Sequence, residues 1–104
     1  MREAQTMSQV LERLQRKGYV EDFKAYGQGM RVIPKNIMVD PEKLIVDEIT
    51  RFEGETDLNE EAMIFALRCP ENNLKGTYVV AFGPMMDSLD VNIVQRLKRN
   101  YGRN

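Results

Sequence analysis

Acidic side chains alternate near the middle of the chain, at Glu53, Glu55 and Asp57. Because alternate side chains of an extended backbone point the same way, these three carboxylates would face one side. Hard cations such as Mg²⁺ bind carboxylate oxygens, so the spacing predicts a Mg²⁺ site. The alternative is a solvent-exposed acidic edge or loop that resists sheet aggregation, which is the commoner use of such a pattern. No other cofactor is expected from the residue types.

Three cations in or beside apolar stretches are candidates for holding an anionic ligand, a phosphosugar or a nucleotide, against a sheet: Arg51, Arg68 and Lys75. The planar guanidinium of arginine matches pairs of phosphate or carboxylate oxygens, and an ammonium group adds a point charge. The same cations would also form ion pairs with glutamates of the chain. We favour these ion pairs, with Glu48, Glu53 or Glu61 as the partners.

The last helical stretch is basic, with Arg96, Lys98 and Arg99 close together. Such a cluster could contact nucleic-acid phosphates. Cations also favour the last turn of any helix because the macrodipole is negative there, and this explanation accounts for most of the cluster. A third interpretation is a contact between subunits, in which the basic helix ends meet the acidic segment 40–61.

Missing residue types exclude several other chemistries. The sequence has no histidine and one cysteine, Cys69, and its serines are Ser8 and Ser88. Ser-His and Cys-His nucleophilic pairs, zinc sites and disulfides within the chain are therefore excluded. The sequence also lacks a glycine-rich phosphate-binding motif. Cys69 alternates with apolar residues and is expected to be buried and inert.

Two helices are predicted at the ends of the chain, where they would flank the strands that position these side chains. Thr6 can cap the first helix with Gln9 as its capping-box partner, and apolar residues at helical spacing continue to about Lys17. Asp87 or Ser88 can cap the second helix. Each helix has one apolar side, which predicts packing against a sheet.

Five stretches between the helices are rich in strand-forming residues: 19–25, 30–33, 44–53, 62–69 and 77–82. Turn-forming residues between them predict hairpins. We predict one α+β domain over residues 1–104, with a four-stranded antiparallel meander, the order α-β-β-β-β-α and both helices on one face of the sheet. The aromatic side chains at strand spacing could line a cleft beneath the sheet, but we expect them in its core: Tyr19, Phe23, Tyr26, Tyr78 and Phe82.

Length and composition agree with a single globular domain. The chain has 104 residues, of which 42% are apolar and 30% are charged, and its net charge is −1. A charge this small creates no global field that would attract nucleic acid or a membrane surface. The first ten residues are polar and lack the apolar core of a signal peptide, and no apolar run is long enough to span a bilayer. These features predict a cytoplasmic protein without a membrane partner.

Two turns with the apolar strands that follow them form a recognisable pattern. Arg51-Phe52-Glu53-Gly54 precedes one such strand, and Leu74-Lys75-Gly76 precedes another that ends at Gly83. Over nearly its whole length the chain resembles a family of short bacterial proteins often labelled phosphoribosylpyrophosphate synthetase. The resemblance implies pyrophosphate transfer from ATP to ribose 5-phosphate. Enzymes with that activity carry paired acids and a Thr/Gly-rich loop after a strand, whereas this chain has Gly83-Pro84-Met85-Met86-Asp87 there, so no catalytic residue is assigned.

The sequence favours a non-catalytic binding or regulatory module that acts through a protein partner or through self-association. The missing catalytic side chains and the segregation of charge along the chain support this hypothesis. One alternative is a phosphosugar- or nucleotide-binding protein with Mg²⁺ on the acidic stretch. A second alternative is nucleic-acid binding through the basic last helix.

Overall fold

The computed structural model describes residues 6–53, 61–82 and 86–101. Helix α1, Met7–Arg16, begins at the capping box that the sequence predicts. The Thr6 hydroxyl accepts a hydrogen bond from the Gln9 backbone N–H (3.1 Å), and the Gln9 side chain accepts one from the Thr6 N–H (2.9 Å). Helix α2, Ser88–Arg99, is capped by Asp87, whose carboxylate accepts from the Leu89 N–H at 2.8 Å. Both helix starts are therefore set by local side-chain bonds.

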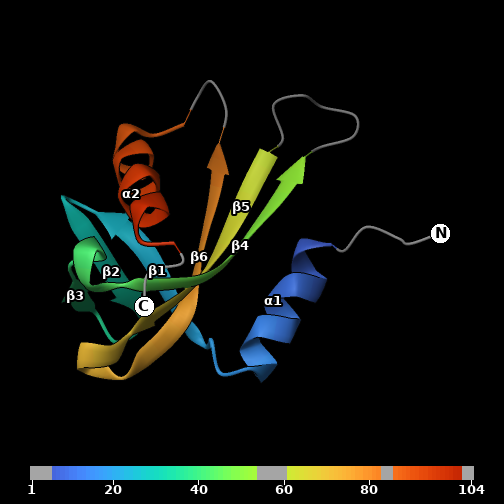
Figure 1. Ribbon diagram of the computed structural model, residues 1–104, viewed down its shortest axis with the longest axis horizontal. Coiled ribbons are helices and arrows are strands. Elements are labelled where there is room, and N and C mark those ends of the chain that lie inside the picture. The colour runs from blue at the N-terminus through green and yellow to red at the C-terminus, as the bar shows by residue number, and fades with distance from the viewer. Residues whose placement is uncertain (1–5, 54–60, 83–85, 102–104) are drawn as a thin grey trace.

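A single six-stranded sheet lies between the two helices (Figure 1). Its strands are β1 Glu21–Tyr26, β2 Gly29–Ile33, β3 Ile37–Val39, β4 Ile45–Glu53, β5 Glu61–Cys69 and β6 Leu74–Phe82, with short 3-10 turns η1 at Pro41–Lys43 and η2 at Pro70–Asn72. In space the strand order is β3-β2-β1-β6-β5-β4. The sheet is thus two three-stranded antiparallel meanders that meet where β1 pairs with β6 in parallel.

The predicted four-stranded antiparallel sheet is wrong, although the α+β class and the terminal helices are confirmed. All five predicted stretches form strands, and the short β3 adds a sixth after a tight turn in which Asn36 takes a positive φ of 58°. Asparagine tolerates this left-handed conformation, so the residues before β3 form a turn and not a loop. The parallel β1–β6 pair could not be inferred from hairpin spacing because its strands lie at opposite ends of the chain.

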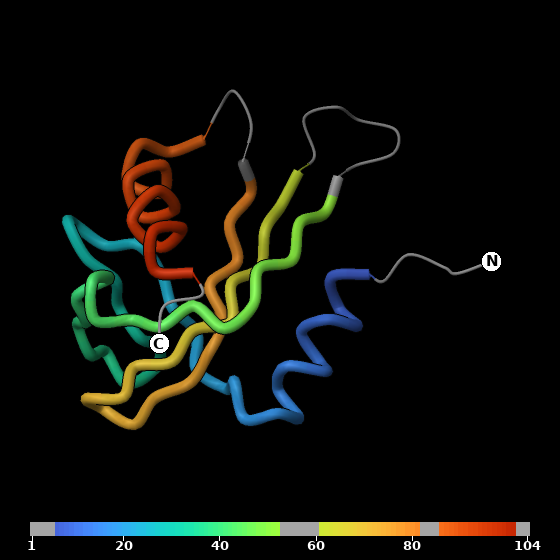
Figure 2. Tube along the Cα trace, in the orientation of Figure 1, coloured from blue at the N-terminus to red at the C-terminus, as the bar shows by residue number. Residues whose placement is uncertain are grey.

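The parallel seam between β1 and β6 consists of two residue pairs, Glu21 with Gly76 and Asp22 with Thr77. Beyond these pairs the strands diverge, as the tube in Figure 2 shows. Gly76 is required at the seam: a Cβ atom there would lie 2.2 Å from the Glu21 carbonyl oxygen. Glycine allows the two backbones to approach this closely, so one residue type controls the junction of the two meanders.

The two helices pack on opposite faces of the sheet, which corrects the prediction that both cover one face. Side chains of β5 alternate between two apolar cores: Phe65 and Leu67 pack in the core that includes α2, and Ile64 in the core that includes α1. Helix α1 contributes Val10 and Leu14 to its core. At β5 and β6 the molecule therefore has three layers, with α1 on one face of the sheet and α2 on the other.

Candidate functional site

Two of the three predicted anion-binding cations lie together. Arg68 on β5 and Lys75 on β6 are directly opposite each other in the antiparallel register, next to the end of α1. Arg51 on β4 is directly opposite Met63, a residue of the other core, and forms an ion pair with Glu61 at 3.1 Å. Arg51 therefore lies on the α2 side of the sheet, away from the other two cations.

Asp47 occupies the space where an anionic ligand of Arg68 would bind. The Arg68 Nε and Nη2 atoms donate to the two Asp47 carboxylate oxygens at 2.7 and 3.0 Å, and the Tyr19 hydroxyl donates to the same carboxylate at 2.6 Å. The hydrogen bond from Arg68 lowers the pKa of Asp47. Burial and the bond to Asp47 raise the pKa of Tyr19 to about 12. At neutral pH the carboxylate is charged and the phenol neutral, so neither is poised for proton transfer.

Lys75 binds the end of α1. Its ammonium donates to the Lys17 carbonyl oxygen at 2.9 Å and lies 4.3 Å from the centre of the Tyr19 ring. This cation meets the negative end of the helix dipole and an aromatic face at the same time. Lys75 thus attaches the end of α1 to the sheet, whereas Arg68 joins β5 to β4 through Asp47, which was not among the predicted partners.

The Asp47–Arg68 pair gives a pH-dependent stability. Because the folded-state pKa of Asp47 is lowered from its ordinary value of 3.8, its stabilising effect is present above that value and is lost as pH falls through the folded-state pKa. We expect Asp47→Asn to lower the free energy of unfolding by about 1 kcal/mol at pH 7, a small value because water reaches the pair. The difference from wild type should shrink below about pH 4.

Urea unfolding followed by circular dichroism at about pH 7 and pH 3 measures this difference. Asp22→Asn is the matched control, because Asp22 is 3.9 Å from Lys24 and both side chains are about half exposed (51% and 55%). The control should change stability little at either pH. An Asp47→Asn effect equal at both pH values would contradict the proposed role of the carboxylate charge.

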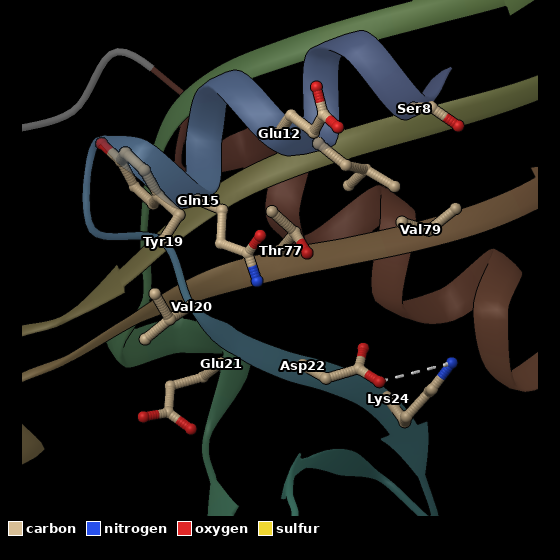
Figure 3. Close-up of a pocket in the computed structure, with 11 residues that line it drawn as sticks. Ser8, Glu12, Gln15, Tyr19, Val20, Glu21, Asp22, Lys24, Thr77 and Val79 are labelled. Atoms are coloured by element: carbon tan, nitrogen blue, oxygen red, sulfur yellow. Dashed lines mark ion pairs between the residues drawn. The ribbon is translucent and has the colours of Figure 1, made fainter. Parts of the chain in front are cut away.

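A groove of about 560 Å³ lies beside this cluster, on the same face of the sheet. Figure 3 shows Glu12 and Gln15 of α1 on one side, Asp22 and Lys24 of β1 on the other, and Thr77 and Val79 of β6 as its floor. Tyr19 closes one end. The groove exists because β1 leaves β6 after two residue pairs while α1 stays over β5 and β6.

The groove opens onto a part of the sheet that neither described helix covers, here named the open face. It is the α1-side surface of β1, β2 and β3, formed by Asp22, Lys24, Tyr26, Arg31, Ile33 and Met38. Tyr26 is 54% exposed and Met38 is 51% exposed. The prediction that Tyr26 is a core residue is wrong, whereas Phe23 and Tyr78 are buried as predicted. Tyr26 points away from the core because it lies an odd number of residues from Phe23 on the same strand.

Sequence reasoning did not find the open face, although a signal was present. In β1 the polar Asp22 and Lys24 alternate with the apolar Phe23 and Ala25. This period of two indicates one buried side and one uncovered side. Which strands would be uncovered depended on where α1 packs, and that position follows from the order of strands in space.

The three predicted nucleic-acid residues do not act as one basic cluster. Arg96 is 19% exposed and pairs with Glu42 at 2.9 Å and Asp40 at 3.5 Å. It also donates to the Gln28 carbonyl oxygen at 2.7 Å, so it joins α2 to η1 and to the β1–β2 turn. Lys98 and Arg99 are exposed on the last turn of α2. The contact between basic helix ends and the acidic segment 40–61 was predicted between subunits. Here Arg96 forms it with Asp40 and Glu42 of its own chain.

The predicted metal ligands fall mostly outside the described residues. Glu53 ends β4, and Glu55 and Asp57 lie in the segment 54–60 that the structure does not describe. Among the residues that are described, no three carboxylate or thiol side chains lie close enough together to hold a metal ion. The Mg²⁺ site stays a prediction.

Comparisons with protein-family models, with curated proteins and with solved structures found no match to this chain. The resemblance to the short bacterial proteins therefore also stays a prediction. Neither of the described helices is long and apolar enough to cross a membrane.

Proposed function

We propose that this protein is a non-catalytic interaction module that binds a protein partner on the open face and the adjoining groove. The observation that carries this proposal is that α1 covers only half of its side of the sheet. Val10 and Leu14 of the helix pack on β5, while Tyr26 and Met38 of the other meander are more than half exposed. A sheet face left uncovered beside a groove is a surface that a partner can bury.

The side chains of the open face are of the types that contribute most to protein interfaces. Tyrosine, methionine and arginine are enriched in interface cores. Gly29, directly opposite Tyr26 on β2, has no side chain, and a Cβ there would lie 4.0 Å from the end of the Met38 side chain. Methionine adapts its shape to different partners. The patch therefore combines an aromatic anchor, an adaptable apolar side chain and a cation.

The shape of the surface favours a protein partner over a small molecule. A small ligand is usually enclosed by a cleft that buries most of its surface. Here the groove is open along one side, and the open face continues from it as a flat sheet surface through Lys24, which belongs to both. A net charge of −1 does not attract a nucleic acid at long range.

The test compares variants of the open face with a variant of the opposite surface. Wild-type protein is immobilised and incubated with extract of its own cells, and bound proteins are identified. We expect Tyr26→Ala with Met38→Asp to reduce capture of the specific partner at least ~30-fold, because loss of an interface anchor costs about 2 kcal/mol or more. Val91→Asp on the outer side of α2, where Val91 is 39% exposed, is the control and should not change capture.

Sedimentation of the pure protein shows whether the partner is a different protein or a second copy of this chain. A concentration-dependent dimer that the Tyr26/Met38 variant abolishes would show that the partner is a second copy of the chain. Circular dichroism and melting temperature verify that each variant is folded. Capture that is lost with Val91→Asp but kept with the Tyr26/Met38 variant would place the interface on α2 and reject the proposal.

A further inference from the structure

Among the residues that the structure describes, Arg31 in the middle of the open face has no acidic partner. Its Nε atom is buried and has no hydrogen-bond partner, and Arg31 forms no ion pair with any residue in the described ranges. Two other arginines on the α1 side of the sheet do have acidic partners: Arg13 pairs with Glu48 at 2.6 Å, and Arg68 pairs with Asp47 at 2.7 Å. A buried guanidinium Nε–H without an acceptor is an unfavourable arrangement in the free protein.

A second cation lies next to Arg31. Lys24 on β1 is directly opposite Arg31 on β2, so both side chains are on the same side of the sheet. Like charges in this position repel each other. Asp22 lies 3.9 Å from the Lys24 ammonium and is half exposed, so it offsets little of this repulsion. The free protein thus holds two adjacent positive charges that an added anion would stabilise.

The aromatic ring of Tyr26 holds Arg31 in position. The centre of the guanidinium group is 5.1 Å from the centre of the Tyr26 ring, within the range of a cation–π contact. Met38 lies directly opposite Arg31 on β3, so its side chain is on the same face of the sheet. The Tyr26 ring beside the guanidinium partly shields the cation from water, which strengthens its attraction for an anion.

We propose that Arg31 and Lys24 receive a carboxylate from an acidic, extended segment of the protein partner. The inference rests on the proposed function and names the chemistry that the open face recognises. The guanidinium fork can donate two parallel hydrogen bonds to a carboxylate, and Lys24 adds a point charge. The partner's flanking side chains contact Tyr26 and Met38. A nucleic acid presents many phosphates and needs more cations than this face has, because Asp22 stands beside Lys24.

The first test measures what Arg31 does to the free protein. Arg31→Met keeps the length of the side chain and removes its charge. We expect the melting temperature to stay within about 2 °C of wild type or to rise, whereas Arg68→Met, which breaks a paired cation, should lower it by about 4–8 °C. A fall for Arg31→Met as large as that for Arg68→Met would show that Arg31 is structural, and would overturn the proposal.

The second test measures carboxylate binding directly. The probe is an N-acetylated, C-amidated Glu-Val-Glu-Val-Glu peptide, whose carboxylates lie on one side when it is extended. We expect saturable shifts of the Arg31 Nε–H signal in NMR spectra, absent with the matched Gln-Val-Gln-Val-Gln peptide and weakened at least ~10-fold by Lys24→Met. No shift at ~1 mM acidic peptide would overturn the inference. A stronger response to an oligothymidine strand would assign the site to nucleic acid instead.

The cell-extract capture experiment separates failure of this inference from failure of the proposed function. If the partner is lost with Met38→Asp but retained with Arg31→Met, the open face binds a protein without using the cation pair, so the proposed function stands and the carboxylate site is rejected. If Arg31→Met and Lys24→Met each reduce capture of the partner while Val91→Asp does not, the result supports both the proposed function and the carboxylate site.

Discussion

Gly76→Ala is expected to destabilise the protein by at least ~3 kcal/mol, enough to unfold much of a marginally stable small domain. A Cβ at this position would lie 2.2 Å from the carbonyl oxygen and 2.6 Å from the carbonyl carbon of Glu21. Both are backbone atoms, so no side-chain rotation relieves the overlap. The seam has two residue pairs, and moving β1 away from β6 disturbs both of them.

Gly27→Ala is the control for this substitution. An added Cβ at Gly27 has no neighbour within 4 Å, and the cost there comes from its positive φ of 58° alone. That cost is about 1 kcal/mol. Urea unfolding followed by circular dichroism gives both values, because the chain has no tryptophan to report by fluorescence. A loss for Gly76→Ala no larger than that for Gly27→Ala would mean that the seam tolerates a wider spacing than the structure shows.

Asn100→Ala should have the second-largest effect, a loss of about 2–3 kcal/mol. Asn100 is 4% exposed, and its side-chain amide donates to the Pro41 carbonyl oxygen at 3.0 Å and the Leu44 carbonyl oxygen at 3.2 Å. Alanine removes both hydrogen bonds and leaves the two carbonyl oxygens in a buried region without these donors. Leaving buried acceptors unsatisfied costs more free energy than losing an ordinary hydrogen bond. The residue holds the end of α2 to η1 and the start of β4.

Asn92→Ala in α2, the helix that Asn100 caps at its end, is the matched comparison. Asn92 is exposed and accepts one long hydrogen bond from Arg96, 3.4 Å between the two atoms. Alanine has a higher helix propensity, so this substitution should be neutral or slightly stabilising. Thermal unfolding of the two variants in parallel measures the difference. Equal melting temperatures for them would show that the buried amide contributes nothing beyond helix propensity.

Local structure was predictable from neighbouring residues. The capping box of Thr6 and Gln9, the Asp87 cap and the η1 turn with Asp40 and Pro41 are formed by side chains within a few positions of the backbone groups they bind. Such bonds depend little on the rest of the chain. The predicted burial of Cys69 is confirmed for a similar reason, because strand alternation assigns it to the apolar side of β5.

The candidate site was predictable only in its components. The sequence shows that Arg68 and Lys75 are cations in apolar strands, but Asp47 and Tyr19 reach them only after β4 and α1 have packed against β5. Arg96 and its partner Glu42 are far apart in sequence and meet through the contact of α2 with η1. Pairings of this kind depend on the path of the whole chain, which no local pattern encodes.

The α+β class, the helix ends and the strand-forming stretches could be predicted from the order of the amino acids, because each follows from side-chain periodicity and from bonds between near neighbours. Tertiary packing was needed to place β1 beside β6, to set the helices on opposite faces and to bring Tyr26, Arg31 and Met38 to one uncovered surface. These features depend on the seam at Gly76, where a close backbone approach between strands far apart in the chain joins the two meanders and so determines which face remains open.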